Sequence, residues 1–164
     1  TFYGNALGAP TAMGDAGVGQ VLAVAEWFPN QGGAASDAFY KQFLARFPDP
    51  AQDYMHMRKQ WMMQALGDAL KQVGPKAKDA GVDAFALALA LEQSQGSLGG
   101  HAAQMRASDH QLQQPLAVAQ MEKQGNEGTA FGVEGSGYGF KVVRRIGAAD
   151  ASLPTTCQMK RPTS

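Results

Sequence analysis

The stretch that most constrains the fold is residues 106–120, where a short polar segment runs into a proline and then into an apolar segment. The polar part contains Arg106, Asp109 and His110, and Pro115 precedes the apolar part. A proline restricts the backbone before it to extended conformations, and a short apolar run is typical of a strand. The pattern predicts a loop that leads into a strand, and loops of this kind carry binding groups on rigid scaffolds.

Upstream of this stretch, one apolar run is followed by three helical patterns. Residues 21–28 form a nearly continuous apolar run before Pro29, and its length and valine content favour a buried strand. In the next segment aromatic side chains recur every four residues, which predicts a helix that Ser36 caps. A longer helix is expected over residues 52–73, and a third helix is expected to be capped by Asp79.

Helical spacing also predicts which side chains of the second and third helices face the core. They are Met62, Leu66, Ala69, Leu70 and Val73 in the second helix, and Val82, Phe85, Ala86, Leu89 and Ala90 in the third. Downstream, strands are expected over residues 102–107, 116–121 and 140–146, with an extended tail after Asp150. Strand, helices and strands in this order indicate an α/β fold.

Composition and charge exclude several classes of function. Apolar residues make up 45% of the chain and charged residues 17%, as in a folded domain with a core. The formal net charge is zero, so nothing favours nucleic acid or an anionic membrane as a partner. No run approaches the roughly 20 apolar residues of a membrane span. Because the chain starts at Thr1 without a methionine, we expect a processed or truncated product.

The sequence contains no constellation typical of a metal site or of an enzyme. None of His56, His101 and His110 stands at ligand spacing from another histidine or a cysteine. The adjacent Ser108, Asp109 and His110 do not suit a catalytic triad, because consecutive side chains diverge. We therefore expect no catalysis, no metal and no cofactor.

Three groups of residues are candidates for binding, each with a structural alternative. Arg106 can hold a carboxylate bidentately, or it can pair with Asp109 and brace the loop. Trp27 ends its strand and either joins the core or faces a ligand. Tyr3 and Asn5 end a first short predicted strand, where ligands bind in open α/β sheets.

The single cysteine, Cys157, excludes an internal disulfide framework. It is either a lone thiol near the tail or one half of a disulfide to a segment outside this chain.

Four segments together resemble a known family. They are Met105 to Gln111, Gln114 to Leu116, Gly137 to Lys141, and Leu153 to Pro162. In this order they are similar to the C-terminal half of the solute-binding proteins of branched-chain-amino-acid-type ABC transporters, and weaker similarity extends back to Phe2. The resemblance implies the type 1 periplasmic-binding fold, in which two three-layer α/β/α lobes hold a ligand between them.

The resemblance also implies how the chain is divided between the lobes. Residues 1–28 would belong to the C-terminal lobe, residues 29–114 to the N-terminal lobe with crossovers at both ends, and residues 115–164 to the C-terminal lobe as closing strands and tail. His110 and Gln111 would belong to the hinge. Members of the family are longer, so the chain is expected to be a fragment that pairs with the N-terminal half of the same protein.

The function implied by the resemblance is that of a non-enzymatic periplasmic receptor. It would deliver an amino acid or a related organic acid to the membrane permease of an ABC transporter, with Tyr3, Asn5, Trp27, Arg106 and Asp109 as ligand-binding residues. Amino-acid binders of this family place an acidic residue just after the first strand of this half, where this chain has Asn5 or Ala6. The ligand is therefore expected to be a small carboxylate-bearing or polar organic solute, and not necessarily an α-amino acid. A ligand-sensing domain or an enzyme on a similar α/β scaffold is the alternative.

Overall fold

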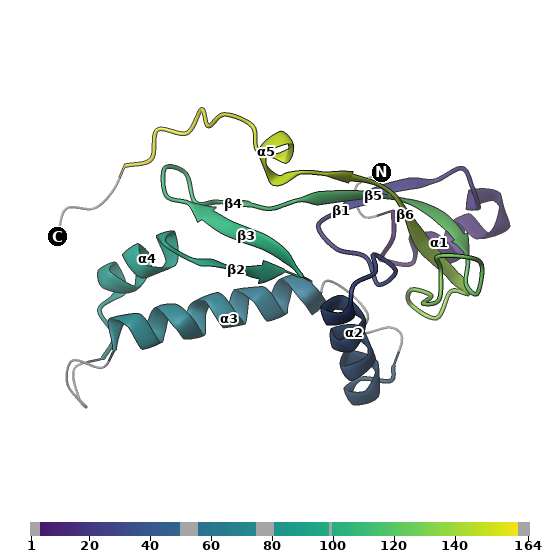
Figure 1. The fold of residues 1–164 in the computed structure, drawn as a ribbon, viewed down its shortest axis with the longest axis horizontal. Coiled ribbons are helices and arrows are strands. Elements are labelled where there is room, and N and C mark those ends of the chain that lie inside the picture. The colour runs from purple at the N-terminus through teal and green to yellow at the C-terminus, as the bar shows by residue number, and fades with distance from the viewer. Residues whose placement is uncertain (1–3, 50–55, 75–80, 99, 161–164) are drawn as a thin grey trace.

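The structure, a computed structural model, describes residues 4–49, 56–74, 81–98 and 100–160. These residues form two three-stranded antiparallel sheets, which lie end to end, and helices α3 and α4 lie under one of them (Figure 1). We name the sheet of strands β1, β5 and β6 sheet A, and the sheet of strands β2, β3 and β4 sheet B. The α/β fold class predicted from the sequence is confirmed.

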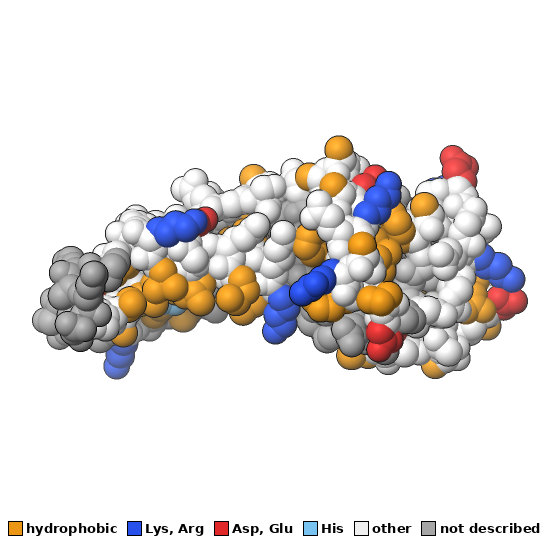
Figure 2. Space-filling model, turned by 90° about the horizontal axis from the view of Figure 1, so that it is seen from below, with side chains coloured by type: hydrophobic (Ala, Val, Ile, Leu, Met, Phe, Trp, Pro, Cys, Tyr) orange, Lys and Arg blue, Asp and Glu red, His pale blue; other side chains and the backbone are white. Residues whose placement is uncertain are grey.

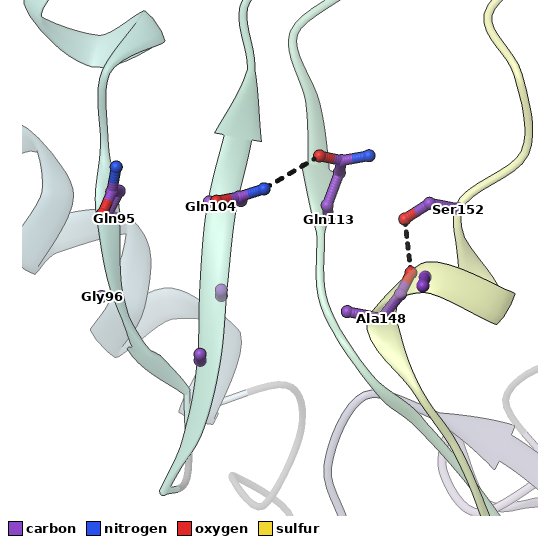
Figure 3. Close-up of a pocket in the computed structure, with 9 residues that line it drawn as sticks. Gln95, Gly96, Gln104, Gln113, Ala148 and Ser152 are labelled. Atoms are coloured by element: carbon purple, nitrogen blue, oxygen red, sulfur yellow. Dashed lines mark hydrogen bonds between the residues drawn. The ribbon is translucent and has the colours of Figure 1, made fainter.

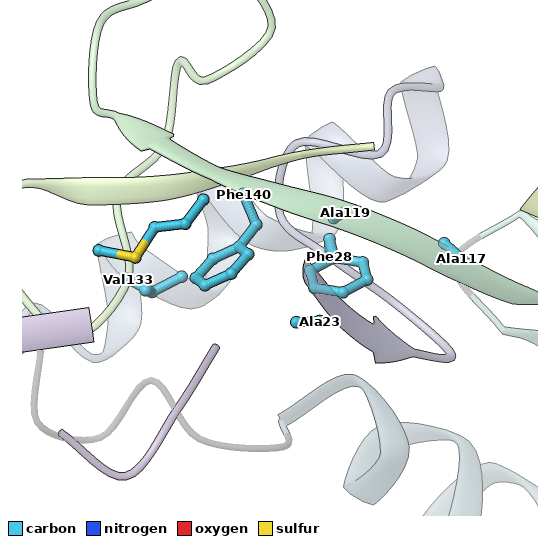
Figure 4. Packing of buried hydrophobic residues seen from close by; sticks show 7 residues of the cluster. Ala23, Phe28, Ala117, Ala119, Val133 and Phe140 are labelled. Atoms are coloured by element: carbon cyan, nitrogen blue, oxygen red, sulfur yellow. The ribbon is translucent and has the colours of Figure 1, made fainter. Parts of the chain in front are cut away.

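Sheet A holds the larger core of the molecule. Its strands are β1 (Leu22–Ala25), β5 (Leu116–Lys123) and β6 (Tyr138–Ile146), with β5 in the centre. Burial alternates along β5, so Ala117, Ala119 and Met121 all point into the core. The rings of Phe28 and Phe140 stack there with centroids 6.0 Å apart (Figure 4). The strands predicted over 116–121 and 140–146 are confirmed.

The strand predicted over residues 21–28 is confirmed only in a shorter form. It is an edge strand that pairs antiparallel with β5, and Leu22 is 47% exposed. The expectation of burial on both faces was therefore wrong, because an antiparallel edge strand needs cover on one face only. The first predicted strand ends in a turn at Gly4 and Asn5, and its residues 1–3 lie outside the described part.

Sheet B is built from shorter and more polar strands. They are β2 (Gln95–Leu98), β3 (His101–Arg106) and β4 (Gln111–Gln113). The strand predicted over 102–107 is confirmed as β3, whereas β2 and β4 were not predicted. Their glutamine-rich and glycine-rich sequences lack the apolar or alternating pattern of a half-buried strand.

The helices are placed mainly between the first and the second strand. They are α1 (Ala9–Met13) with the 3₁₀ turn η1 (Gly14–Gly17), α2 (Ala34–Arg46), α3 (His56–Val73), α4 (Ala84–Glu92) and α5 (Ala148–Ala151). In the described part of the chain, no helix is long and apolar enough to cross a membrane. After α5 the chain is extended as predicted, up to Lys160.

Helix α2 begins three residues earlier than the sequence predicted. Gly33, with φ of 100°, takes the N-cap position, and Ser36 lies inside the helix. The Ser36 hydroxyl instead accepts a hydrogen bond of 2.8 Å from Nε1 of Trp27. The prediction of Ser36 as a cap was wrong because this buried hydroxyl serves a tertiary contact.

Helix α4 is capped by Asp83, whose carboxylate accepts hydrogen bonds from the amides of Phe85 and Ala86 at 2.9 and 3.1 Å. The residue predicted for this role, Asp79, lies outside the described residues. Of the side chains predicted to face inward, Ala90 is buried, but Val82 and Leu89 are 48% and 37% exposed.

The inward face of α3 is turned by about one residue from the predicted face. Ala69 is buried as predicted. Trp61 is also buried and Ala65 packs against its cluster, although neither was predicted to face inward, whereas Met62 is 51% exposed. The bulky Trp61 contacts sheet B at Gly96, where an added Cβ would lie 2.9 Å from the indole nitrogen. Anchoring this ring fixes the rotation of the helix.

The chain passes three times between the two sheets. It leaves sheet A after β1, returns through residues 114–115 between β4 and β5, and leaves again after β6 toward α5, which lies beside β4 (Figure 1). The three connections bring distant parts of the sequence together at one junction.

Candidate functional site

The junction between the sheets is pinned through the side chain of Asn30. Its Nδ2 donates to the carbonyl oxygen of Phe131 at 2.7 Å, and its Oδ1 accepts from the amide of Phe131 at 2.8 Å. Gly139 packs against the same place, and a Cβ there would clash with the Phe131 carbonyl oxygen. The first crossing is thus fixed to the loop that precedes β6.

The side chain of Arg145 on β6 also holds the junction together. Its Nη2 donates to the carbonyl oxygen of Gln31, and its Nη1 lies 3.2 Å from Nε2 of His101 on β3. Burial and the nearby guanidinium lower the pKa of His101, which favours the neutral imidazole. Arg145 therefore connects sheet A, the first crossing and sheet B.

Trp27 belongs to an aromatic cluster at this junction. Its ring packs edge-on against Phe39 and Tyr40, with centroids 6.2 and 5.6 Å away. Tyr40 in turn packs against Phe131 at 4.9 Å, and its hydroxyl donates to the carbonyl oxygen of Gly132 at 3.3 Å. Trp27 is only 8% exposed, so in this conformation its side chain is part of the core.

Close to this cluster, Glu134 binds the segment before α1. Its two carboxylate oxygens accept hydrogen bonds from the amides of Leu7 and Gly8, at 2.6 and 2.8 Å. Both Leu7 and Gly8 have left-handed backbones, with φ of 59° and 74°. Consecutive amides in such a turn form an anion-binding concavity, and here a carboxylate of the same chain fills it.

A small cavity lies between α2 and the loop from Gln124 to Gly137. It has a volume of about 200 Å³ and is lined by Tyr40, Leu44, Pro48, Gln124, Phe131, Gly132, Glu134 and Gly135. Among the described residues, its lining therefore combines one carboxylate with aromatic and aliphatic surface and includes no cationic side chain. Since α2 follows the first crossing and the loop joins two strands of sheet A, the cavity draws on both sides of the junction.

Asn5, a predicted site residue, stands two positions before the amide pair that holds Glu134. It is half-buried, and its Oδ1 is buried without a hydrogen-bond partner in the described structure. The other predicted residue of this segment, Tyr3, lies outside the described residues.

Arg106 and Asp109 form a bidentate ion pair away from this cavity. Nε and Nη2 of Arg106 donate to the two oxygens of Asp109, at 2.8 and 2.5 Å. Nη1 donates to the carbonyl oxygen of Leu153 in the tail, and Nη2 also donates to Oε1 of Gln111. Hydrogen bonding to Arg106 holds the pKa of Asp109 well below its usual range. The pairing alternative from the sequence is confirmed, and we call this group the latch.

The latch does not itself connect the sheets. Residues 107–110 form the turn between β3 and β4 within sheet B, and only residues 114–115 lead to sheet A. His110 is in this turn, with φ of 57°, and its Nε2 lies 2.7 Å from Oε1 of Glu92 at the end of α4. The connection from sheet B to sheet A thus lies at residues 114–115, and residue 114 is four positions beyond His110.

The open face of sheet B forms a second, larger cavity of about 520 Å³ with α5 (Figure 3). Each strand contributes a glutamine, and Gln104 and Gln113 point toward one another with a hydrogen bond of 3.3 Å. None of the described residues that line this cavity has a charged side chain. Within the described ranges, no three histidine, cysteine, aspartate or glutamate side chains are grouped to hold a metal ion.

Sequence reasoning missed the role of Glu134. It had found no carboxylate near Asn5, but folding brings one there from a residue 127 positions beyond Leu7. The available signal was a lone acidic residue inside a glycine-rich bend, and in the structure this residue has a positive φ of 52°. A one-dimensional pattern does not specify which distant segment such a bend meets.

Comparison with known proteins gives one consistent result. A sequence model of the family described as "Periplasmic binding protein" matches residues 1–126. Leu/Ile/Val-binding protein homolog 4 of Brucella abortus, and that of Brucella suis, are each 27% identical to the chain over 169 residues, which covers 98% of the chain and 38% of the relative. The chain therefore spans about two fifths of the length of these relatives.

Solved structures share the fold. The leucine-, isoleucine-, valine-, threonine- and alanine-binding protein of Brucella ovis, in a closed conformation, superposes with a TM-score of 0.76 at 24% identity over 99% of this chain and 40% of that protein. A solute binding protein of an ABC transporter from Rhodopseudomonas palustris, in complex with 3,4-dihydroxybenzoic acid, gives a TM-score of 0.59 at 15% identity, over 84% of this chain and 33% of that one.

Proposed function

The chain belongs to the periplasmic binding protein family, and from this premise we propose that it forms the C-terminal part of a two-lobed solute receptor for ABC-type uptake. Its fold is that of the type 1 periplasmic binding proteins. The observation that carries the proposal is the pinned junction, where three chain segments pass between two sheets. A receptor that closes around a solute needs such a fixed pivot between two bodies.

The division into lobes is supported by the membership of the sheets. Strand β1 lies within residues 1–28, β2 to β4 lie within 29–114, and β5 and β6 lie within 115–164. Sheet A therefore joins the first and last of these segments, as one lobe would, and sheet B belongs to the middle one. In the proposed mechanism a solute shifts the receptor to its closed state only through contacts that it gains there.

We further propose the chemical class and the setting. The named relatives and neighbours include binders of aliphatic amino acids and a protein in complex with an aromatic acid, which supports an amino acid or a related small carboxylate as the solute. Glu134 and Tyr40 both line the cavity between α2 and the loop from Gln124 to Gly137. Trp27 packs against Tyr40, and Asn5 precedes by two residues the amides that bind Glu134, so the solute would lie near these two residues. The other partners would be the N-terminal half, which completes the second lobe, and a membrane permease met in the periplasm.

Calorimetry and small-angle scattering of the receptor with its N-terminal half test this function. L-leucine, L-alanine, 4-methylpentanoate and 3,4-dihydroxybenzoate are the probes. We expect micromolar binding of at least one probe, with a smaller radius of gyration in the complex. Absence of binding by every probe contradicts the proposal. Chemical conversion of a bound probe, followed by NMR, would favour the alternative of an enzyme on this scaffold.

A further inference from the structure

We propose that residues 147–155 form a strap that limits how far sheet A and sheet B move apart, and that the latch holds this strap on sheet B. The inference rests on the proposed receptor function, because it concerns the motion by which such a receptor opens and closes. The C-terminal tail thereby gains a role in that motion.

The strap begins in sheet A and is fastened to sheet B. Strand β6 ends at Ile146, which pairs with Leu116 of β5. From there the chain forms α5 beside β4 and continues as the tail (Figure 1). The carbonyl oxygen of Leu153 then accepts a hydrogen bond of 2.8 Å from Nη1 of Arg106 on β3. A side chain of one sheet thus holds a segment that starts in the other.

The fastened strap closes a ring across the junction. Residues 114–115 lead from β4 to Leu116, the partner of Ile146, so the strap and this connection meet sheet A at the same residue pair. On sheet B, Gln111 of β4 pairs with Arg106, the residue that binds Leu153. Rotation of one sheet against the other changes the distance that the strap has to span. A strap fixed at both ends therefore restricts this rotation.

The latch is well placed to hold the strap. Arg106 binds both oxygens of Asp109, whose side chain is only 9% exposed, and Oδ1 of Asp109 also accepts a hydrogen bond of 3.1 Å from the amide of Gln111. These contacts fix the planar guanidinium, so its bond to Leu153 costs little further side-chain freedom. Hydrogen bonding to Arg106, and to a smaller extent to the side chain of Thr155, lowers the pKa of Asp109, so the carboxylate contacts the strap as well.

Helix α5 sets the length of the strap. It has four residues, which span about 6 Å as a helix and about 13 Å when extended. The amide of Ala151 donates to the carbonyl oxygen of Gly147 at 2.9 Å, and the hydroxyl of Ser152 donates to that of Ala148 at 2.6 Å. Wider separation of the sheets has to unwind this turn or release the latch. The strap therefore favours states in which the sheets lie close together.

The test measures the separation of the sheets in the ligand-free receptor with its N-terminal half. Spin labels are attached to Ser97→Cys in β2 and to Glu127→Cys in the loop after β5, both exposed positions, with every other cysteine replaced by serine. Double electron–electron resonance gives the distribution of distances between the labels, and circular dichroism checks that each variant is folded.

Two variants release the strap in different ways. A chain that ends at Ser152 lacks the fastened part of the tail, and Arg106→Lys keeps the charge but loses the fork that binds Asp109 and Leu153 together. Both should shift the distances to longer values and broaden their distribution. A chain without residues 161–164 and Arg46→Lys, which changes an exposed arginine of α2, are the matched controls and should leave the distribution unchanged.

Unchanged or shorter distances in the chain that ends at Ser152 overturn the strap. A shift in that chain without a shift in Arg106→Lys overturns the assignment to the latch. The deletion removes no residue of a described helix or strand, so it decides the question even if Arg106→Lys fails to fold. Because the measurement uses no solute, failure of every probe to bind contradicts the receptor function and leaves the strap standing.

Discussion

Sheet A and sheet B contain the same number of strands but differ in how complete they are. The core of sheet A includes six residues that are at most 2% exposed, namely Ala23, Phe28, Ala117, Ala119, Met121 and Phe140. Sheet B contributes one buried residue, Ala103, to its cluster, and its other face opens into the glutamine-lined cavity of about 520 Å³. Sheet A thus forms its own core, whereas sheet B relies on what packs against it.

The helices beside sheet B show the same incompleteness. Apolar side chains remain exposed on α3 and α4, including Met62, Met63, Leu70 and Leu89, and hydrophobic side chains gather along this side of the molecule (Figure 2). Exposed apolar surface of this extent indicates a face that packs against further protein. The comparison shows that only sheet A has a well-buried core within this chain, which agrees with a chain that covers 38% of the length of its relatives.

The largest expected difference between the two regions comes from matched methionine truncations. Met121 of sheet A is fully buried, while Met105 of sheet B is half-buried. Met121→Ala should lower the free energy of unfolding by about 2–5 kcal/mol, and Met105→Ala by about 1–2 kcal/mol. Denaturant titration measures both losses. Equal losses would mean that sheet B is as well packed as sheet A.

A second comparison uses two glycines. Gly139→Ala should destabilise the protein by about 1–3 kcal/mol, because the new Cβ meets the backbone oxygen of Phe131. Gly67→Ala in α3 should instead stabilise by up to about 1 kcal/mol, because no atom lies within 4 Å of its Cβ position and alanine favours the helix. Thermal melts of the two variants check the sign of each change. A neutral Gly139→Ala would show that the junction is not tightly packed.

A third comparison tests single hydrogen bonds. Trp27→Phe removes the donor to the buried hydroxyl of Ser36 and should cost about 1–2 kcal/mol. Gln104→Ala removes the exposed contact with Gln113 and should change stability by no more than about 0.5 kcal/mol. A double-mutant cycle of Trp27→Phe with Ser36→Ala would isolate the bond, and zero coupling would contradict its role.

The smallest expected effect concerns acid sensitivity. Hydrogen bonds from Arg106 lower the pKa of Asp109, and hydrogen bonds from Lys123 and Tyr138 lower that of Asp15. A carboxyl whose folded pKa is depressed stabilises the protein above its unfolded pKa of about 4, and this contribution is lost as the pH falls toward the folded pKa.

Asp109→Asn should therefore destabilise the protein at pH 7 and approach wild type as the pH falls below about 4. Asp15→Asn should follow the same course with a smaller amplitude, because the side chain of Asp15 is 70% exposed and that of Asp109 only 9%. Melting temperatures between neutral pH and acid measure both profiles. A constant difference between Asp109→Asn and wild type would exclude the latch as the source.

Much of sheet A was predictable because its strands are apolar and alternate in burial. The apolar runs around Val118 and Val142 predict β5 and β6. The pairing of Arg106 with Asp109 could be predicted because the two residues are only three positions apart. The glutamine-rich β2 and β4 were not predictable, because only their neighbours in the hairpins make them strands. The hydrogen bonds of these strands join segments that are close in sequence, but no pattern of side chains predicts them.

The candidate site was less predictable than the fold. Asn5 and Trp27 were identified from their positions at strand ends, but their surroundings depend on contacts across the sequence. Asn30 meets Phe131 across 101 residues, and Leu7 meets Glu134 across 127. Such contacts are decided by the packing of whole strands, which local propensity does not encode.

The pairing of β1 with β5 has a consequence for how the chain is made. Sheet B is a run of consecutive hairpins, which can form as soon as the ribosome releases them. In sheet A, Leu22 of β1 pairs with Gln120 of β5, and β6 pairs with β5 only afterwards, so the sheet is complete only when most of the chain has been synthesised. Until then the apolar strand β1 lacks the partner strand that it has in sheet A, and of the two described sheets the one with the larger core is the last to fold. Factors that shield nascent chains should therefore act on β1 during this interval.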